Sequence, residues 1–153
     1  MCEEIAACAG APELVEMLSK TGLPMAIATS SRYAGVEKKR KRHSNIFQHM
    51  KAVVAGDDPA VTNGKPAPDI YLEAARRIQV DPSECLVFED ALSGVRAGKA
   101  AGCFVVAIPD QRFTPKEKQV FVDEADVVIE DLWQFDGTRF GLDVDMSKIK
   151  EEL

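Results

Sequence analysis

The chain has 153 residues, of which 46% are hydrophobic and 29% charged, with a formal net charge of -6. This composition is typical of a soluble globular protein and excludes disordered and fibrous classes. The negative charge disfavours general nucleic-acid binding. No apolar run approaches the roughly 20 residues that cross a bilayer, and Met1 to Glu4 lack the basic start of a secretory signal. We therefore expect one domain, residues 1–153, that is cytoplasmic, with no nucleic acid and no membrane among its partners.

Cysteines and a basic run have ordinary structural interpretations. Cys2, Cys8, Cys85 and Cys103 show no CxxC pairing and no histidine at metal-ligand spacing. The last two lie in apolar, strand-like runs, which predicts that they are small core residues. The run Lys38–Arg42 favours a solvated helix face over a nuclear signal or a phosphate track.

In chain order, Pro12 opens an amphipathic helical pattern that Gly22 closes. The apolar residues 25–28 then predict a strand that runs into Thr29-Ser30-Ser31. Hydroxyls and free backbone N–H groups at the end of a strand suit an oxyanion, and they equally suit the N-cap of the helix expected at residues 33–42. These two interpretations are compatible.

A second strand is predicted at residues 52–55, after Ile46 and Phe47 return to the core. The Gly and Pro content of residues 63–69 predicts a loop that carries Lys65 to the same edge as the strand ends. A lysine there is either a solubilising residue or a functional one. The helix that follows has Pro68 in its first turn and buries one face, formed by Ile70, Ala74 and Ile78.

The apolar run at residues 85–88 ends in Glu89 and Asp90 and is followed by an Ala/Gly-rich helical pattern up to Gly102. A solvated strand end is the simpler interpretation of an isolated acid pair. The remaining elements are a strand at 104–108, a helix at 114–124, a short strand at 126–129 and a polar tail at 146–153. Alternating strands and helices predict an α/β fold with a parallel sheet between two layers of helices.

The carboxyl ends of parallel strands meet at one edge of a sheet, so this fold brings five candidate residues together. They are Thr29, Ser30, Lys65, Glu89 and Asp90. A hydroxyl, backbone amides and an ammonium suit the oxygens of a phosphate, and two carboxylates suit Mg²⁺. The acid pair is sufficient for magnesium only if the substrate or another residue completes its shell.

These segments resemble the haloacid-dehalogenase-like (HAD) hydrolase superfamily, in its pseudouridine-5′-phosphatase-like and β-phosphoglucomutase-like branch. The resemblance covers roughly residues 11–129, with a further match at 140–142 before a polar tail at 143–153. Its motifs are similar to Ala28–Arg32, to Gly64–Asp69, and to Val87–Asp90 with Gly94 and the Ala100–Gly102 turn.

The resemblance implies a three-layer α/β/α Rossmann-like core. It also implies a magnesium-dependent phosphatase that acts on a small phosphorylated metabolite, such as a nucleotide or sugar phosphate, through an aspartyl-phosphate. In that scheme Thr29 and the Ser30 amide bind the phosphoryl oxygens, Lys65 neutralises charge, and Glu89 with Asp90 hold Mg²⁺. Thr29 and Lys65 are then the catalytic residues of this chain.

The chain departs from the family at the first motif, Asp-x-Asp-Gly-Thr, which supplies the nucleophile at the end of a central strand. Residues 2–10 contain no such motif, and the cap domain that selects the substrate is missing. Asp136-Gly137-Thr138 repeats three letters of the motif, but Glu130–Trp133 before it is not an apolar strand. We interpret it as a turn, with circular permutation as the alternative.

We therefore expect an incomplete, truncated core that is inactive by itself. Loss of the central strand would leave two inner sheet edges unpaired or force them together, which favours self-association or a partner that supplies the missing half. The alternatives are a non-catalytic relative that binds phosphate, metal or protein, and one half of a split enzyme.

Overall fold

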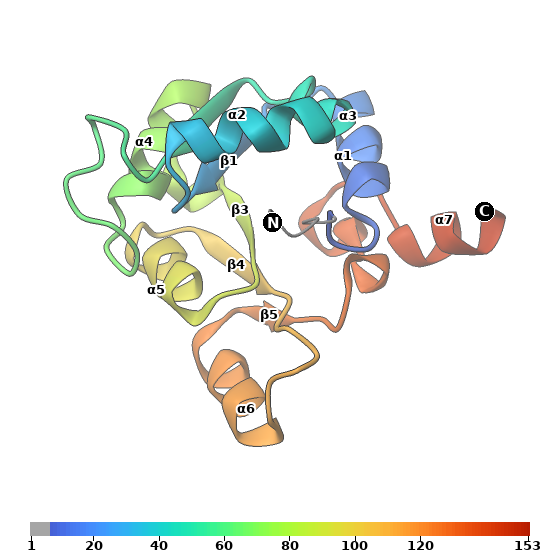
Figure 1. Cartoon of the computed structure of the whole chain (residues 1–153). Coiled ribbons are helices and arrows are strands. Elements are labelled where there is room, and N and C mark those ends of the chain that lie inside the picture. Colours follow the sequence, from blue (N-terminus) through green and yellow to red (C-terminus); the bar gives the residue numbers. More distant parts are fainter. Residues whose placement is uncertain (1–6) are drawn as a thin grey trace.

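The computed structural model describes residues 7–153, so Cys2 lies outside the described residues. Strands and helices alternate along the chain as the sequence predicts (Figure 1). The strands are β1 (Ala26–Thr29), β2 (Ala52–Ala55), β3 (Leu86–Glu89), β4 (Phe104–Ala107) and β5 (Val127–Val128). The α-helices are α1 (Ala11–Lys20), α2 (Tyr33–Arg42), α3 (Ser44–Phe47), α4 (Asp69–Ile78), α5 (Leu92–Ala100), α6 (Pro115–Glu124) and α7 (Met146–Glu152). No helix in residues 7–153 is long and apolar enough to cross a membrane.

Every strand pairing is parallel, but the described strands form two sheets and not one. β1 pairs with β2 in register Ala26 to Ala52, and β3 pairs with β4, which pairs with β5. Within residues 7–153, no strand hydrogen-bonds to β1 or β3 on the side where the two sheets face each other. The expectation of two unpaired inner edges is confirmed for this part of the chain.

Side chains of β4 alternate between two hydrophobic clusters, which shows that the larger sheet is covered on both faces. Val105 belongs to a cluster with α4, α5 and α6, whereas Val106 belongs to one with α1 and the segments near α7. Successive side chains of a strand point to opposite faces, so two clusters mean three layers. Figure 1 shows α4 and α5 on one side of the strands and α1 and α7 on the other. The predicted three-layer α/β/α architecture is confirmed.

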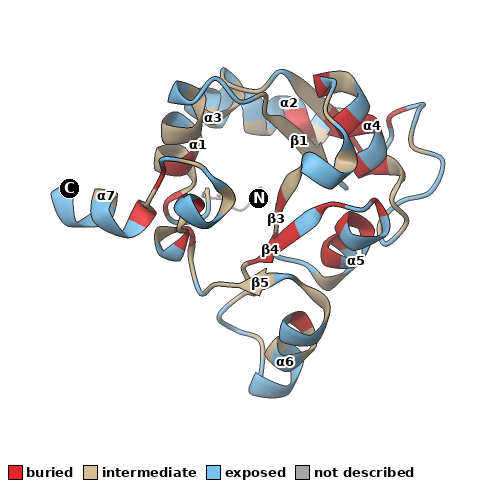
Figure 2. Cartoon of the chain, turned by 180° about the vertical axis from the view of Figure 1, so that it is seen from behind, coloured by how far each residue is buried: buried red, intermediate tan, exposed pale blue. Residues whose placement is uncertain are grey.

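Helix α4 joins the two sheets. Its predicted apolar face, Ile70, Ala74 and Ile78, is buried. The first cluster contains Val54 from β2 and Val87 from β3 together with Ile70, so one core spans both sheets. Figure 2 shows buried residues concentrated on α4, α5 and β4. The unpaired inner edges are therefore bridged by side-chain packing through α4.

Some details differ from the sequence-based expectation, and strands β4 and β5 are shorter than predicted. Strands β1 and β3 begin one residue later than predicted and include Thr29 and Glu89 as their last paired residues. Ile46 and Phe47 do not enter the core: they are half-buried in the single turn of α3. Helix α3 has only four residues, and none of them is fully buried. Its apolar side chains therefore remain partly in contact with solvent.

Other local predictions are confirmed. Cys103 is buried and Cys85 packs against the same cluster. The basic run lies in α2 with Lys38, Arg40 and Lys41 exposed. Residues 136–138 form a turn, because Asp136 accepts a hydrogen bond from the Thr138 N–H at 3.0 Å and a 3₁₀ helix begins at Gly137.

Candidate active site

The carboxyl ends of β1 and β3 open into one pocket of about 370 Å³. All five residues proposed from the sequence line it: Thr29, Ser30, Lys65, Glu89 and Asp90. Their convergence follows from parallel topology, because every parallel strand delivers its final residue to the same edge. The structure therefore brings the predicted hydroxyl, ammonium and carboxylates together.

The loop after β1 is held in a fixed shape beside this pocket. The Thr29 hydroxyl accepts a hydrogen bond from the Ser31 N–H at 3.2 Å, and the Ser31 carbonyl accepts one from the Gly56 N–H at 2.9 Å. A Cβ atom at Gly56 would lie 2.4 Å from the Ser30 carbonyl oxygen, so only glycine permits this approach. Helix α2 begins directly afterwards, and helix N-termini favour anions. The loop is thus suited to the oxygens of a phosphate.

Lys65 lies between the two sheets. Its Nζ donates to Glu89 Oε1, to the Tyr71 hydroxyl at 3.1 Å and to the Ala28 carbonyl at 3.4 Å. The Lys65 side chain is 9% exposed and that of Glu89 is 6% exposed. An ammonium has three N–H donors, so each already has a partner here. Any effect of Lys65 on an anion in the pocket would therefore come from its charge and not from a free N–H donor.

Tyr71 contacts two of these residues, Lys65 and Glu89, and is absent from the candidates proposed from the sequence. Its hydroxyl donates to Glu89 Oε1 and accepts from Lys65, and Lys65 Nζ lies 4.8 Å from its ring centroid. Burial, and secondarily the negative charge of Glu89, raise the pKa of Tyr71 well above its ordinary value, so the hydroxyl remains a donor. The available signal was a tyrosine on the buried face of α4, because a buried tyrosine hydroxyl requires a partner.

The acid pair divides into a buried and an exposed member. Glu89 Oε2 accepts from the Ala91 N–H at 3.3 Å, while Oε1 is engaged by Lys65 and Tyr71. Asp90 is exposed on the same pocket. Residues 7–153 contain no group of three or more His, Cys, Asp or Glu side chains that could hold a metal. Two carboxylates still fit Mg²⁺, which commonly takes one or two and fills its shell with water and substrate oxygens.

Gly94, in the first turn of α5, lies against the Glu89 carboxylate. A Cβ atom there would lie 2.0 Å from Glu89 Cδ. We expect Gly94→Ala to lower the free energy of unfolding by about 1–3 kcal/mol through overpacking, measured by urea denaturation. Gly35→Ala is the matched control, since α2 leaves its added methyl 3.9 Å from Ser31 Cβ, and it should stabilise by about 0.5–1 kcal/mol. Equal effects of both changes would contradict the prediction.

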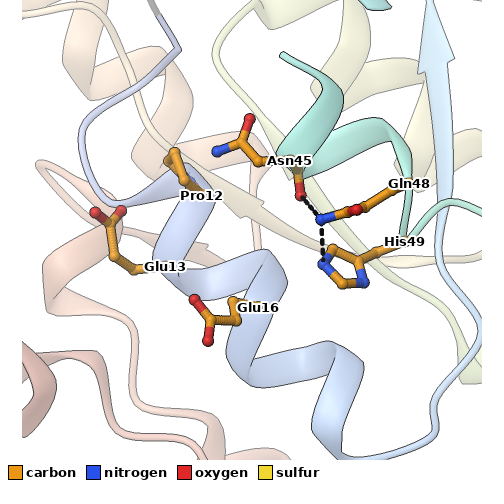
Figure 3. A pocket seen from close by; sticks show the side chains of 6 residues that line it. All are labelled: Pro12, Glu13, Glu16, Asn45, Gln48 and His49. Carbon is orange, nitrogen blue, oxygen red and sulfur yellow. Dashed lines mark hydrogen bonds between the residues drawn. The ribbon is translucent and has the colours of Figure 1, made fainter.

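A second pocket, of about 340 Å³, lies between α1 and α3 (Figure 3). It is lined by Pro12, Glu13, Glu16, Asn45, Gln48 and His49. Gln48 Nε2 lies 3.3 Å from His49 Nε2 and donates to the Asn45 carbonyl at 3.4 Å. None of the five proposed site residues lines this pocket, whose lining comes from α1, α3 and the turn after α3. The strand-end pocket is therefore the better candidate.

Parallel strands covered by helices, with hydroxyl, ammonium and carboxylate side chains at their carboxyl ends, define an α/β protein with a polar pocket at the strand ends. The sequence model of one family, described as haloacid dehalogenase-like hydrolase, matches residues 1–102 of this chain. The chain belongs to the haloacid dehalogenase-like hydrolase family. The resemblance found in its motifs is thereby confirmed.

Individual relatives agree with this assignment. The chain is 43% identical over 136 residues to (DL)-glycerol-3-phosphatase 1, mitochondrial, of Arabidopsis thaliana, covering 87% of this chain and 44% of that protein. It is 41% identical to the "Probable pseudouridine-5'-phosphatase" of Drosophila melanogaster over 87% of this chain and 57% of that protein. The crystal structure of an Entamoeba histolytica HAD hydrolase, family IA, variant 3, matches with a TM-score of 0.75 and 30% identity, covering 89% of this chain and 60% of that one. The chain spans about half the length of these relatives.

Proposed function

We propose that this chain forms the phosphate- and magnesium-binding side of a HAD-type phosphatase site for small phosphorylated metabolites. The convergence of Thr29, Ser30, Lys65, Glu89 and Asp90 on one pocket carries the proposal. Relatives named as glycerol-3-phosphatase and pseudouridine-5'-phosphatase support a phosphate monoester of a polyol, sugar or nucleoside as the substrate.

Each residue has a role that fits its position. The Thr29 hydroxyl and the Ser30 N–H bind phosphoryl oxygens, and Lys65 offsets their negative charge. Glu89 and Asp90 hold Mg²⁺, which, when bound, offsets charge on the transferring phosphoryl group. Lys65 also remains bonded to Glu89, which sets the distance between the anion-binding and carboxylate sides of the pocket.

In the family scheme, an aspartate of the first motif attacks phosphorus, the ester P–O bond breaks, and water then hydrolyses the aspartyl-phosphate. Residues 2–10 of this chain do not contain that motif. We propose that the 153-residue chain by itself binds phosphate without appreciable turnover, because phosphate monoesters are among the slowest compounds to react without a catalyst.

Binding of orthophosphate, measured by titration calorimetry, tests this function. Thr29→Val should weaken binding about tenfold or more, since a hydrogen bond to a charged group contributes about 1.5–3 kcal/mol. Thr62→Val, at an exposed position outside the pocket, should leave the affinity unchanged. Equal affinities of the two variants would refute the assignment of the phosphate site.

The turnover part is tested with a generic aryl phosphate and Mg²⁺, and background rates are expected. Turnover that Asp90→Ala abolishes would overturn the proposed inactivity. A second chain that carries the first motif separates the two alternatives. It should restore turnover if this chain is one half of a split enzyme, and it should leave the background rate unchanged if this chain is a non-catalytic phosphate- or metal-binding relative.

We also propose that the unpaired edges of β1 and β3 receive a strand from another chain, either a second copy or a partner that carries the first motif. Unpaired edges in a sheet expose backbone N–H and C=O groups that favour such pairing. Light scattering should therefore show oligomers, or thermal unfolding should occur at low temperature. A monomer with a cooperative, high-temperature transition would contradict this proposal.

A further inference from the structure

We infer that Tyr71 is a positioning residue that holds the Lys65 ammonium in place beside Glu89 at the edge of the pocket. The inference rests on the proposed function, because it concerns Lys65, the residue proposed to offset the negative charge of a bound phosphate. It adds a residue from α4, outside the strand ends, to the machinery of this site.

The hydrogen bonds around Tyr71 form a closed triangle. Its hydroxyl accepts from Lys65 Nζ at 3.1 Å and donates to Glu89 Oε1, which also accepts directly from Lys65. An ammonium can only donate and a carboxylate can only accept, whereas a tyrosine hydroxyl does both. Tyr71 is therefore the one member of the triangle that both accepts and donates, which links the ammonium to the carboxylate.

The Lys65 side chain is held less rigidly by its own segment than Tyr71 is. Lys65 has a flexible four-carbon stem and lies on the loop between β2 and α4. Tyr71 is 8% exposed, belongs to the first hydrophobic cluster and is fixed by helix α4. Among the described residues, the one partner of Lys65 Nζ outside this triangle is the Ala28 carbonyl, at the long distance of 3.4 Å. The ring under Nζ and the hydroxyl beside it therefore restrict where the ammonium can lie.

The chain contains a matched control in Tyr33. Its hydroxyl donates to Asp58 Oδ2, so it makes the same tyrosine–carboxylate bond. Tyr33 and Asp58 do not line the strand-end pocket. Removing either hydroxyl leaves a buried carboxylate with one donor fewer, so both changes destabilise the fold, but only one of them frees Lys65.

The experiment compares Tyr71→Phe with Tyr33→Phe in two measurements. The first is the rate at which N-hydroxysuccinimidyl acetate acetylates Lys65, followed by peptide mass spectrometry with Lys148 as the exposed internal standard. The second is the dissociation constant of orthophosphate. We expect Tyr71→Phe to raise both about 3- to 10-fold, the range that corresponds to one hydrogen bond. Tyr33→Phe should lower the melting temperature about as much as Tyr71→Phe does. It should leave the acetylation rate of Lys65 and the dissociation constant of orthophosphate within about twofold of the wild-type values.

The outcomes separate this inference from the proposed function. If Lys65 acetylation is unchanged in Tyr71→Phe, or rises equally in Tyr33→Phe, Tyr71 is only a packing residue and the inference is wrong. If Lys65→Met leaves orthophosphate binding unchanged, the proposed phosphate site is wrong, while the acetylation rates still decide whether Tyr71 holds Lys65. Increases confined to Tyr71→Phe in both measurements support the inference.

Discussion

Lys65→Met is expected to lower the free energy of unfolding by about 3–5 kcal/mol, because it leaves the Glu89 carboxylate buried without its cationic partner. The two side chains are only 9% and 6% exposed, so water cannot replace the lost ammonium. Tyr71 and the Ala91 N–H would remain as the donors to Glu89. The loss also removes the polar link between β1 and β3. Urea denaturation with linear extrapolation measures the effect.

A double variant tests whether the charge pair itself is responsible. Glu89→Gln alone should also destabilise, because Lys65 would then be the unpaired buried charge. Lys65→Met combined with Glu89→Gln should cost less than the sum of the two single changes, since neither charge remains. Lys99→Met serves as the surface control: Lys99 is paired with Asp126 at 2.6 Å but is 41% exposed, so about 0–1 kcal/mol is expected. Equal losses for Lys65→Met and Lys99→Met would contradict the prediction.

The strand-end residues of the site could be predicted from the sequence because they depend on topology alone. An apolar run followed by Thr29 or Glu89 predicts the end of each strand to within one residue. Parallel alternation with helices then fixes the edge where those residues meet. The position of Lys65 follows from the Gly and Pro that flank it. None of these inferences requires knowledge of side-chain packing.

Tyr71 and the acids after β2 could not be predicted in the same way. Their roles depend on how α4 is oriented across two sheets, which is decided by packing of its buried face and not by its helical period. Asp57 and Asp58 follow the second strand side by side, and nothing in the sequence distinguishes one acid from the other. In the structure it is 4% exposed and bonded to Tyr33 and Arg77, which are far from it in sequence.

Arg77→Met is expected to have an effect as large as that of Lys65→Met, about 3–5 kcal/mol, because one guanidinium serves two buried carboxylates. Arg77 donates to Asp58 at 2.7 Å and to Glu73 at 2.6 Å. These two residues are 4% and 8% exposed. Without Arg77, the donors to Asp58 within residues 7–153 would be Tyr33 and the Ala60 N–H. Urea denaturation again gives the free energy.

Arg76→Met is the matched control for this prediction. Arg76 also binds Glu73, through two hydrogen bonds of 2.7 and 2.8 Å, but its side chain is 71% exposed. Its removal leaves Glu73 paired with Arg77, so a loss of about 0–1 kcal/mol is expected. If Arg76→Met were as costly as Arg77→Met, exposure would not govern the strength of these pairs.

The acid dependence of stability provides an independent test of the same network. Hydrogen bonds from Arg76 and then Arg77 lower the pKa of Glu73 to about 2, and the hydrogen bond from Tyr33, with lesser contributions from the Ala60 N–H and Arg77, lowers that of Asp58. A lowered folded-state pKa stabilises above the unfolded-state pKa, about 4 for both groups, and that contribution is lost as the pH falls toward 2. The stability difference between wild type and Arg77→Met should therefore be largest near neutral pH and shrink between about pH 4 and 2. A difference that stays constant over this range would show that Arg77 stabilises the fold by packing and not by pairing with the two carboxylates.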